Sequence, residues 1–557
     1  MLNSSRTRIV AYLPIIIALA VIAGMMLGSR LMRVSQVTQE TPAVFFAPRF
    51  DKTSDVMLYI LEDYVNPVSK LDLEKEAVLG MLKSLDPHSQ YIPREDFDEV
   101  VDPLLGAFEG IGIQFRMERD SCTVIHTIPG GPSEKAGVIA GDRIIIINDS
   151  TVAGVGIRDR DIVRKLRGSK GSQVNVSVYR RGFRDLITFT ITRDVIPTYS
   201  VDVAWMADEE TGYIRLSKFS ATTHQELVEA IRNLKNQGMQ RLIFDLRGNS
   251  GGILQAAISV ADEFLDKNRL IVYTEGHNRP RQYSFATEQG GFTTPPLVVL
   301  IDESSASASE IIAGAIQDND RGIVIGRRSF GKGLVQEQMN LRDGSAIRLT
   351  VARYYTPTGR SIQKPYENGD DEYFMEFYRR ILSGELTSPD SIHFNDTLRF
   401  TTPAGRIVFG GGGIMPDVFV AADSDPLLQY YFTVMNKGLI HRFAFDYTDA
   451  NRERLTRIGD AAQFAKQFNV TDAMIAEFVN FATESGVKTD IRITEASKKE
   501  IAHQIKAFIA RNLYGEVGFF PIFLQTDLTF QTALEKIRQW PLGEPVPLSL
   551  IEQKQNR

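Results

Sequence analysis

The sequence predicts an α/β core combined with a small β-rich module and a helical C-terminal region. Between residues 195 and 422, apolar strand-like runs alternate with helical segments, a pattern typical of a largely parallel sheet. Residues 104–193 contain short β-rich runs separated by Gly-Pro and Gly-Asp turns. Residues 425–557 carry apolar side chains at helical spacing. A chain of 557 residues is expected to form roughly three or four domains.

The composition is that of an ordinary folded protein, with 43% hydrophobic and 24% charged residues. The formal net charge of −6 gives no basic excess, so no nucleic-acid partner is predicted. A single cysteine, Cys122, excludes an internal disulfide and a multi-cysteine zinc site, and none of the seven histidines forms an HExxH pair. We therefore predict no metal and no cofactor. Catalysis is expected to come from Ser, Lys, Asp, Glu or backbone groups, or from a lone histidine in a triad.

Residues 9–28 carry no charged side chain and have the length of a helix that crosses a bilayer. This segment predicts an uncleaved membrane anchor, and Arg6 and Arg8 favour a cytoplasmic N-terminus, although Arg30 and Arg33 on the other flank weaken this charge argument. A cleaved signal peptide is the alternative, but no small-x-small site follows Leu27. We expect a single-pass protein of the inner (cytoplasmic) membrane, with the rest of the chain on the periplasmic or extracytoplasmic side.

Helical spacing predicts further helices on both sides of the core. Apolar residues between 71 and 85 lie on one face of a helix, which Asp86-Pro87 is expected to end. Three amphipathic helices are predicted around residues 474–481, 501–509 and 530–537, the second of them opened by a capping box of Ser497 with Glu500. The sequence leaves open whether these helices cover the core, form a homo-oligomer or bind an adaptor.

The β-rich module begins with a glycine-containing run whose amides can converge on a carboxylate: Gly110, Ile111, Gly112 and Ile113. The run Pro129-Gly-Gly-Pro-Ser133, then Ala136-Gly137, Gly141-Asp142 and Ile147-Asn148-Asp149 follow in order. This order resembles a PDZ domain, although Asp149 stands where glycine is usual. The resemblance implies that an extended C-terminal tail pairs with the edge of the module's sheet. The alternative is that these glycines serve turns alone.

The run 302–310, Asp-Glu-Ser-Ser-Ala-Ser-Ala-Ser-Glu, follows an apolar strand and precedes an apolar helix. A small-residue turn of this kind can present a serine hydroxyl at a helix N-terminus, where unpaired N–H groups favour developing negative charge. Four serines compete for this role. They can also serve simply to cap the helix.

Lys332 lies between two glycines at the entry of an apolar strand. A lysine desolvated in such a setting can take a proton from serine, provided that its pKa falls about three units below the ordinary value of roughly 10.4. Gln336 follows four residues later on the same side of a strand and can hold the amine by a hydrogen bond. A surface lysine without a catalytic role is the alternative.

A glycine-rich turn follows the predicted strand 241–245 and contains Gly251 and Gly252. The turn lacks the spacing of a phosphate-binding loop, so its better use is to expose a backbone N–H. Paired with the N–H of Ala308, such an amide would form an oxyanion hole.

Several motifs between residues 50 and 422 closely resemble the C-terminal processing peptidases, also called tail-specific proteases. They are Asp86-Pro87-His88-Ser89-x-Tyr91, the PDZ module, Asp245-Leu246-Arg247-x-Asn249-x-Gly251-Gly252, Ser305-Ala-Ser-Ala-Ser-Glu310, Phe330-Gly-Lys-Gly-x-Val-Gln336 and Gly413-Ile414-x-Pro416-Asp417-Val418. The resemblance implies a serine endopeptidase with Ser307 as nucleophile, Lys332 as base and Gln336 beside it. It also implies a crotonase-like (ClpP-like) α/β core. Arg327-Arg328-Ser329 departs from the family pattern and is expected to alter the charge near the site.

The sequence thus predicts a membrane-anchored serine endopeptidase whose PDZ module engages the exposed C-terminal tails of protein substrates. A catalytically silent envelope scaffold or chaperone is one alternative, and a hydrolase that uses His88 or His224 is another. The expected domains are an anchor (1–35), a helical N-terminal region packing on the protease (36–103), the PDZ domain (104–194), the protease core (195–424, with an insertion at 366–413) and a helical C-terminal region (425–557).

Overall fold

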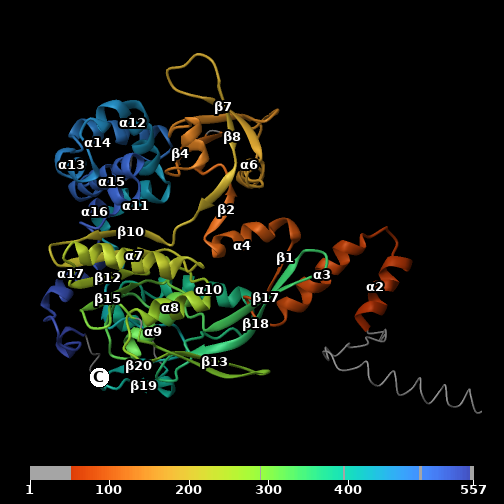
Figure 1. Cartoon of the computed structure of the whole chain (residues 1–557), viewed down its shortest axis with the longest axis vertical. Coiled ribbons are helices and arrows are strands. Elements are labelled where there is room, and N and C mark those ends of the chain that lie inside the picture. The colour runs from red at the N-terminus through yellow and green to blue at the C-terminus, as the bar shows by residue number, and fades with distance from the viewer. Residues whose placement is uncertain (1–51, 119, 289, 393–394, 489–491, 552–557) are drawn as a thin grey trace, which may run out of the picture. The chain divides into compact units, whose positions relative to one another are not determined.

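The computed structural model describes residues 52–118, 120–288, 290–392, 395–488 and 492–551 (Figure 1). The chain divides into two compact units, residues 1–77 and 78–557, each described here by itself. The predicted anchor at residues 9–28 lies outside the described residues. Within the described ranges, no helix combines the length and the apolar character needed to span a membrane.

The first unit contains α2 (Lys52–Asp63) and the start of α3 (Lys70–Lys83). The helix predicted at residues 71–85 is therefore confirmed, and it ends shortly before Asp86-Pro87. No residue of α2 is buried.

The α/β core is built on a six-stranded sheet in the order β10-β11-β12-β15-β16-β21. The first pair of strands is antiparallel and the other pairs are parallel, which confirms the predicted α/β arrangement. The strands are β10 (Val201–Met206), β11 (Thr211–Leu216), β12 (Arg241–Asp245), β15 (Leu297–Ile301), β16 (Ile323–Gly326) and β21 (Val418–Phe419). Strand β15 is buried along its whole length, as expected of a parallel strand covered on both faces.

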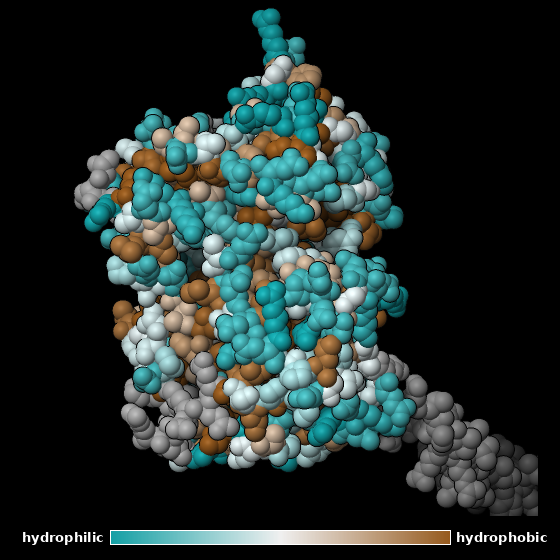
Figure 2. Space-filling view, turned by 90° about the vertical axis from the view of Figure 1, so that its left-hand side faces the viewer, coloured by the Kyte–Doolittle hydropathy of each residue, from teal (hydrophilic) through white to brown (hydrophobic). Residues whose placement is uncertain are grey.

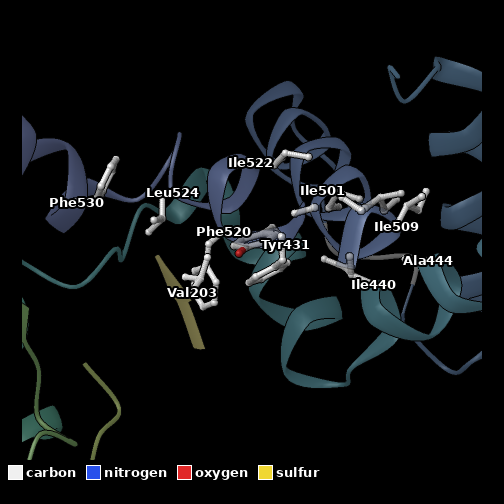
Figure 3. Packing of buried hydrophobic residues seen from close by; sticks show 14 of the residues in the cluster. Val203, Tyr431, Ile440, Ala444, Ile501, Ile509, Phe520, Ile522, Leu524 and Phe530 are labelled. Carbon is white, nitrogen blue, oxygen red and sulfur yellow. The ribbon is translucent and has the colours of Figure 1, made fainter. Parts of the chain in front are cut away.

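Helices cover both faces of this sheet, and alternate residues of each strand point to opposite faces. Leu242 and Phe244 pack in one cluster with helices α7 (Thr223–Asn236), α8 (Leu254–Asp262) and α9 (Ala308–Asp318). Ile243, between them, packs in a second cluster with the C-terminal helices. Figure 3 shows Val203 of the sheet in this cluster beside Tyr431 and Phe520 of those helices. The sequence left open whether the C-terminal helices cover the core. The structure confirms that they pack on it.

The C-terminal region contains more helices than the three predicted. They are α11 (Gln429–Asn436), α12 (Leu439–Thr456), α13 (Ala461–Gln467), α14 (Asp472–Glu484), α15 (Glu495–Tyr514), α16 (Glu516–Phe523) and α17 (Leu528–Gln539). The predicted capping box at Ser497 is wrong, because α15 begins earlier and Thr494 accepts the capping hydrogen bond from the Ser497 amide. The Ser497 hydroxyl instead donates to the carbonyl of Leu427.

A second, five-stranded sheet carries the lysine segment. Strand β18 pairs with β1, β13 and β17, and β13 also pairs with β14. The strands are β1 (Gln90–Ile92), β13 (Leu270–Gly276), β14 (Arg279–Phe285), β17 (Leu334–Asn340) and β18 (Ala346–Tyr355). The predicted insertion contains α10 (Asp370–Leu382) and the paired strands β19 (Arg399–Thr401) and β20 (Ile407–Phe409).

The β-rich module forms its own sheet in the order β3-β4-β5-β7-β8, with β6 paired to β5, around a separate core. Its elements are β3 (Ile113–Glu118), β4 (Ser121–Thr127), α5 (Pro132–Ala136), β5 (Arg143–Ile147), β6 (Ser150–Thr151), α6 (Asp159–Leu166), β7 (Gln173–Tyr179) and β8 (Ile187–Thr192). Helix α4 (Phe97–Leu105) and strand β2 (Ala107–Gly110) precede the module, and strand β9 (Asp194–Pro197) follows it. β2 and β9 pair with each other. On the face seen in Figure 2, hydrophilic and apolar residues are mixed, as on most folded proteins.

Candidate active site

The serine turn joins β15 to α9, and Ser307 is the N-cap residue of that helix. Its φ of 54° and ψ of −109° are rare for a residue with a side chain and cost about 1–3 kcal/mol, so surrounding contacts must hold it. Ser305 and Ser309 are buried, and each donates at 2.9 Å to a backbone carbonyl of the glycine-rich turn. Ser304 is exposed, whereas Ser307 is partly exposed. The neighbouring serines thus fasten the turn and leave Ser307 at its tip.

The Lys332 side chain is half-buried, and its amine donates to Gln336 Oε1 at 2.8 Å. In the described part of the chain, no carboxylate pairs with this amine. Burial and, secondly, the charge of Arg348 lower the pKa of Lys332 below its ordinary value. The Gln336 amide in turn donates to the backbone carbonyl of His88. Lys332 and Gln336 are therefore brought together as the sequence predicted.

A buried carboxylate connects the serine turn to the lysine loop. Glu310 Oε2 accepts from the Ser307 amide at 2.8 Å and from the Lys332 amide at 2.9 Å, while Oε1 accepts from the Gly331 amide at 2.7 Å. The Tyr354 hydroxyl also lies 3.1 Å from the Ser307 carbonyl and 2.8 Å from the Lys332 carbonyl. Burial raises the pKa of Glu310 to about 7, against hydrogen bonds that lower it.

Sequence reasoning assigned no role to Glu310 or Tyr354. Glu310 stood inside the quoted serine motif, and its position three residues after a helix cap was a usable signal for a contact with the cap amide. Tyr354 offered no such signal, because its contact with both segments depends on the pairing of β17 with β18.

The glycine-rich turn lies against the serine. A Cβ atom on Gly251 would come 2.9 Å from Ser307 Cβ and 3.0 Å from the Ala308 nitrogen, so glycine is required there. The Gly251 amide donates to Asn249 Oδ1 at 2.9 Å and is thereby engaged. The amides of Gly252 and Ala308 donate to no other group among the described residues. Of the three amides predicted for an oxyanion hole, these two are therefore available to donate hydrogen bonds to an oxyanion.

His88 and His224, the two histidines considered as alternative catalytic residues, contact groups outside the serine turn. The His88 ring contacts the Tyr373 hydroxyl at 2.8 Å, and burial together with the Lys332 charge lowers the pKa of His88 to about 4. His224 contacts Glu263 at 2.8 Å. Neither ring is hydrogen-bonded to the serine turn in the described part of the chain.

The arginines that depart from the family pattern are engaged in ion pairs. Arg327 pairs with Glu303 at 2.7 Å, and Arg328 pairs with Glu385 at 2.6 Å. Ser329 donates to the buried glutamate of the serine turn. The expected change of charge near the site is offset in part, because Glu385 also pairs with Arg380.

The predicted tail-binding run lies at the start of β3, which is an edge strand of the sheet in the β-rich module. Gly110 ends β2, Ile113 begins β3, and the Ile111 carbonyl accepts from the Ser133 amide and hydroxyl at 3.0 and 2.7 Å. Among the described residues, the amides of Ile111 and Gly112 donate to no acceptor. An unpaired strand edge beside free amides is the arrangement that binds an extended chain end.

Comparison with known families agrees with this arrangement. Residues 210–370 match Peptidase family S41, residues 110–191 match the PDZ domain, and residues 430–515 match a family of unknown function (DUF8443). These matches indicate a serine-type peptidase that carries a PDZ domain.

Three bacterial relatives identify the family. The chain is 36% identical over 347 residues to the carboxy-terminal-processing protease of Bartonella bacilliformis, covering 61% of this chain and 79% of that protein. It is 36% identical to the carboxy-terminal processing protease CtpA of Bacillus subtilis, covering 57% and 67% of the two chains. It is 38% identical to the carboxyl-terminal-processing protease of Picosynechococcus, covering 54% and 72%. The chain belongs to the carboxy-terminal processing proteases.

Proposed function

We propose that the chain is an endopeptidase that cleaves proteins by a Ser307–Lys332 dyad after its PDZ domain has bound their C-terminal tails. The observation that carries the proposal is that Glu310 accepts hydrogen bonds from both the Ser307 and the Lys332 amides, which brings the serine turn and a half-buried lysine together. The pairing of the lysine amine with Gln336, a neutral residue, supports its role as a base.

In the proposed reaction, neutral Lys332 takes the proton of the Ser307 hydroxyl as the oxygen attacks the scissile carbonyl. The amides of Gly252 and Ala308 stabilise the oxyanion. Lys332 then gives the proton to the leaving amine, and an acyl-enzyme forms on Ser307. A water molecule, activated by Lys332, hydrolyses this ester and restores the enzyme.

Three finer features complete the proposal. Residues 9–28 anchor the chain in the inner membrane, with the protease on the extracytoplasmic side, because they carry no charge over the length of a membrane span. The core is crotonase-like. The domains are divided as the sequence predicts, at about residues 35, 103, 194 and 424.

The PDZ role predicts that cleavage depends on the substrate's terminal carboxylate. Gly112→Ala is expected to reduce kcat/KM on a tail-bearing protein about tenfold, because Gly112 has a φ of +73° and an added Cβ would lie 3.0 Å from Ile196. Gly154→Ala is the matched control, since its φ is +74° and nothing lies within 4 Å.

The purified full chain is incubated with one protein substrate that has either a free or an amidated C-terminus. Cleavage is followed by mass spectrometry. We expect amidation to slow the wild type and Gly154→Ala, and to have little effect on the already slow Gly112→Ala. Equal cleavage of both substrates by the wild type would contradict tail recognition.

The pH profile is expected to follow Lys332, because only the neutral amine accepts a proton. Since burial lowers its pKa below 10.5, kcat/KM should rise with pH through an inflection below that value. Arg348→Gln removes a charge that lowers this pKa, so the inflection should move to higher pH. Arg353→Gln, on the same strand but exposed, is the control and should leave the inflection in place.

A second inflection of kcat/KM is expected near pH 7, because burial raises the pKa of Glu310 to about 7. Neither arginine substitution should move this inflection. The profile is measured with a short peptide whose own groups do not titrate in this range. An upper inflection that stays in place in Arg348→Gln would count against Lys332 as the titrating base.

A further inference from the structure

The C-terminal helices reach the glycine-rich turn through one ion pair. Arg247 Nη1 donates to both carboxylate oxygens of Asp527, at 2.9 and 2.8 Å, across 280 residues of sequence. The Arg247 side chain is 12% exposed and that of Asp527 is 17% exposed, so water screens the pair little. Asp527 is also the N-cap residue of α17 and accepts from the Phe530 amide at 2.7 Å.

The remaining donors of Arg247 are directed to Asp245. Its Nε and Nη2 atoms donate to this carboxylate at 2.7–3.0 Å. Asp245 is fully buried and is shared, because Arg215 lies 3.5 Å away and the Tyr213 hydroxyl donates to it at 2.6 Å. Burial lowers the pKa of Arg247, but the charges of Asp245 and Asp527 outweigh it and raise that pKa well above its ordinary value. Two guanidinium groups thus share Asp245, and Asp527 supplies the second negative charge that Arg247 needs.

Contacts of Gly248, Asn249 and Gly251 hold the turn that leads from Arg247 to the Gly252 amide. The Gly248 amide donates to Asp302 at 3.0 Å, and the Asn249 side chain donates to a carbonyl of β11 at 2.9 Å. Asn249 also accepts from the Gly251 amide, which packs on Ser307. A shift of the Arg247 end of this chain of contacts would therefore be passed to the amide proposed to bind the oxyanion.

The position of Asp527 does not depend on the ion pair alone. Phe530 of α17 packs on Tyr213 with ring centroids 5.4 Å apart and on Trp205 at 6.3 Å. Helix α17 also contacts β12, β15 and β16 of the central sheet. The helix is thus anchored by packing, and the role of the carboxylate can be tested separately from the fold.

We propose that Asp527 is a positioning residue that holds Arg247 and, through the turn, the Gly252 amide of the oxyanion site. This inference rests on the proposed Ser307–Lys332 mechanism. It gives the C-terminal helices, which lie outside the motifs shared with the family, a part in catalysis.

The test is Asp527→Asn in the full chain. Asparagine caps a helix as well as aspartate does, so this change removes the charge and keeps the cap. We expect kcat to fall about 10- to 100-fold with little change in KM and an unchanged upper pH inflection, because the oxyanion contact matters in the transition state and Lys332 is untouched. Asp527→Ser, another capping residue without charge, should behave in the same way, and Asp527→Glu should recover part of the rate.

Asp460→Asn is the matched control, because Asp460 caps α13, accepts from the Gln463 amide at 2.8 Å and makes no ion pair in the described part of the chain. A wild-type kcat in Asp527→Asn, or an equal loss in Asp460→Asn, would overturn the inference. Ser307→Ala is measured in parallel. If it stays active, the proposed mechanism fails; if it is inactive while Asp527→Asn is as fast as the wild type, the positioning role alone fails.

Discussion

Replacing Ser307 by alanine is expected to lower kcat for peptide-bond cleavage by about 10⁴-fold or more, because removal of a nucleophile from a coupled serine–base unit removes nearly all of its catalysis. The Ser307 hydroxyl is proposed to be the attacking atom, and two of the nearby serine hydroxyls are already engaged. Those of Ser305 and Ser309 are buried and donate to backbone carbonyls of the glycine-rich turn. The measurement is cleavage of a protein substrate by the purified full chain, followed by mass spectrometry.

Ser304→Ala is the matched control, since Ser304 lies in the same turn but is exposed. We expect it to cleave at the wild-type rate. If Ser307→Ala retains activity after contaminating proteases are removed, the nucleophile has been wrongly assigned. If the wild type cleaves no substrate while it still binds C-terminal tails, the scaffold alternative gains support.

The strands of the central sheet could be predicted because they are buried on both faces, which requires apolar residues along most of their length. β12 contains the apolar run 242–244 and ends at Asp245, and β15 is apolar throughout and is followed by Asp302; near-continuous apolar runs of this kind are typical of strands buried on both faces. The C-terminal helices were harder to predict. α14, α15 and α17 show a clear apolar stripe, whereas α13 spans Ala461–Gln467, too short for periodicity to establish. The start of α15 was misjudged because Thr494 and Ser497 are both good caps, and the contact of Ser497 with Leu427 depends on tertiary packing.

The candidate site divides in the same way. Ser307, Lys332 and Gln336 stand in local motifs, so their residue types and spacing pointed to them. The contacts that bring them together cross between elements, such as Tyr354 on β18, and residue type alone does not reveal them. The sequence also could not show that the Gly251 amide is already hydrogen-bonded. Whether an amide in a glycine-rich turn is free depends on the direction of one side chain, here that of Asn249.

Replacing Lys332 by methionine is expected to lower kcat by about 10⁴-fold, close to the effect at Ser307, because the base and the nucleophile act as one unit. Methionine is unbranched and apolar, so it can fill the space of the lysine stem. Lys332→Arg should be equally inactive, since arginine stays protonated and cannot take the serine proton. Activity in Lys332→Arg would mean that a positive charge, and not a base, is what the site requires.

Stability separates a catalytic lysine from a structural one. Burial disfavours the charged amine of Lys332, as the lowered pKa indicates, and in the described part of the chain no carboxylate pairs with it. We therefore expect the thermal midpoint of Lys332→Met to equal or exceed that of the wild type, because an apolar side chain removes this cost. Lys364→Met is the contrasting variant: burial lowers the pKa of Lys364 as well, but its amine pairs with Glu376 at 3.0 Å and lies 4.1 Å from the centre of the Phe330 ring, so its removal takes a partner from that carboxylate and the midpoint should fall. A lower midpoint in Lys332→Met would show instead that the amine holds the fold together, and the loss of activity would then say nothing about a base.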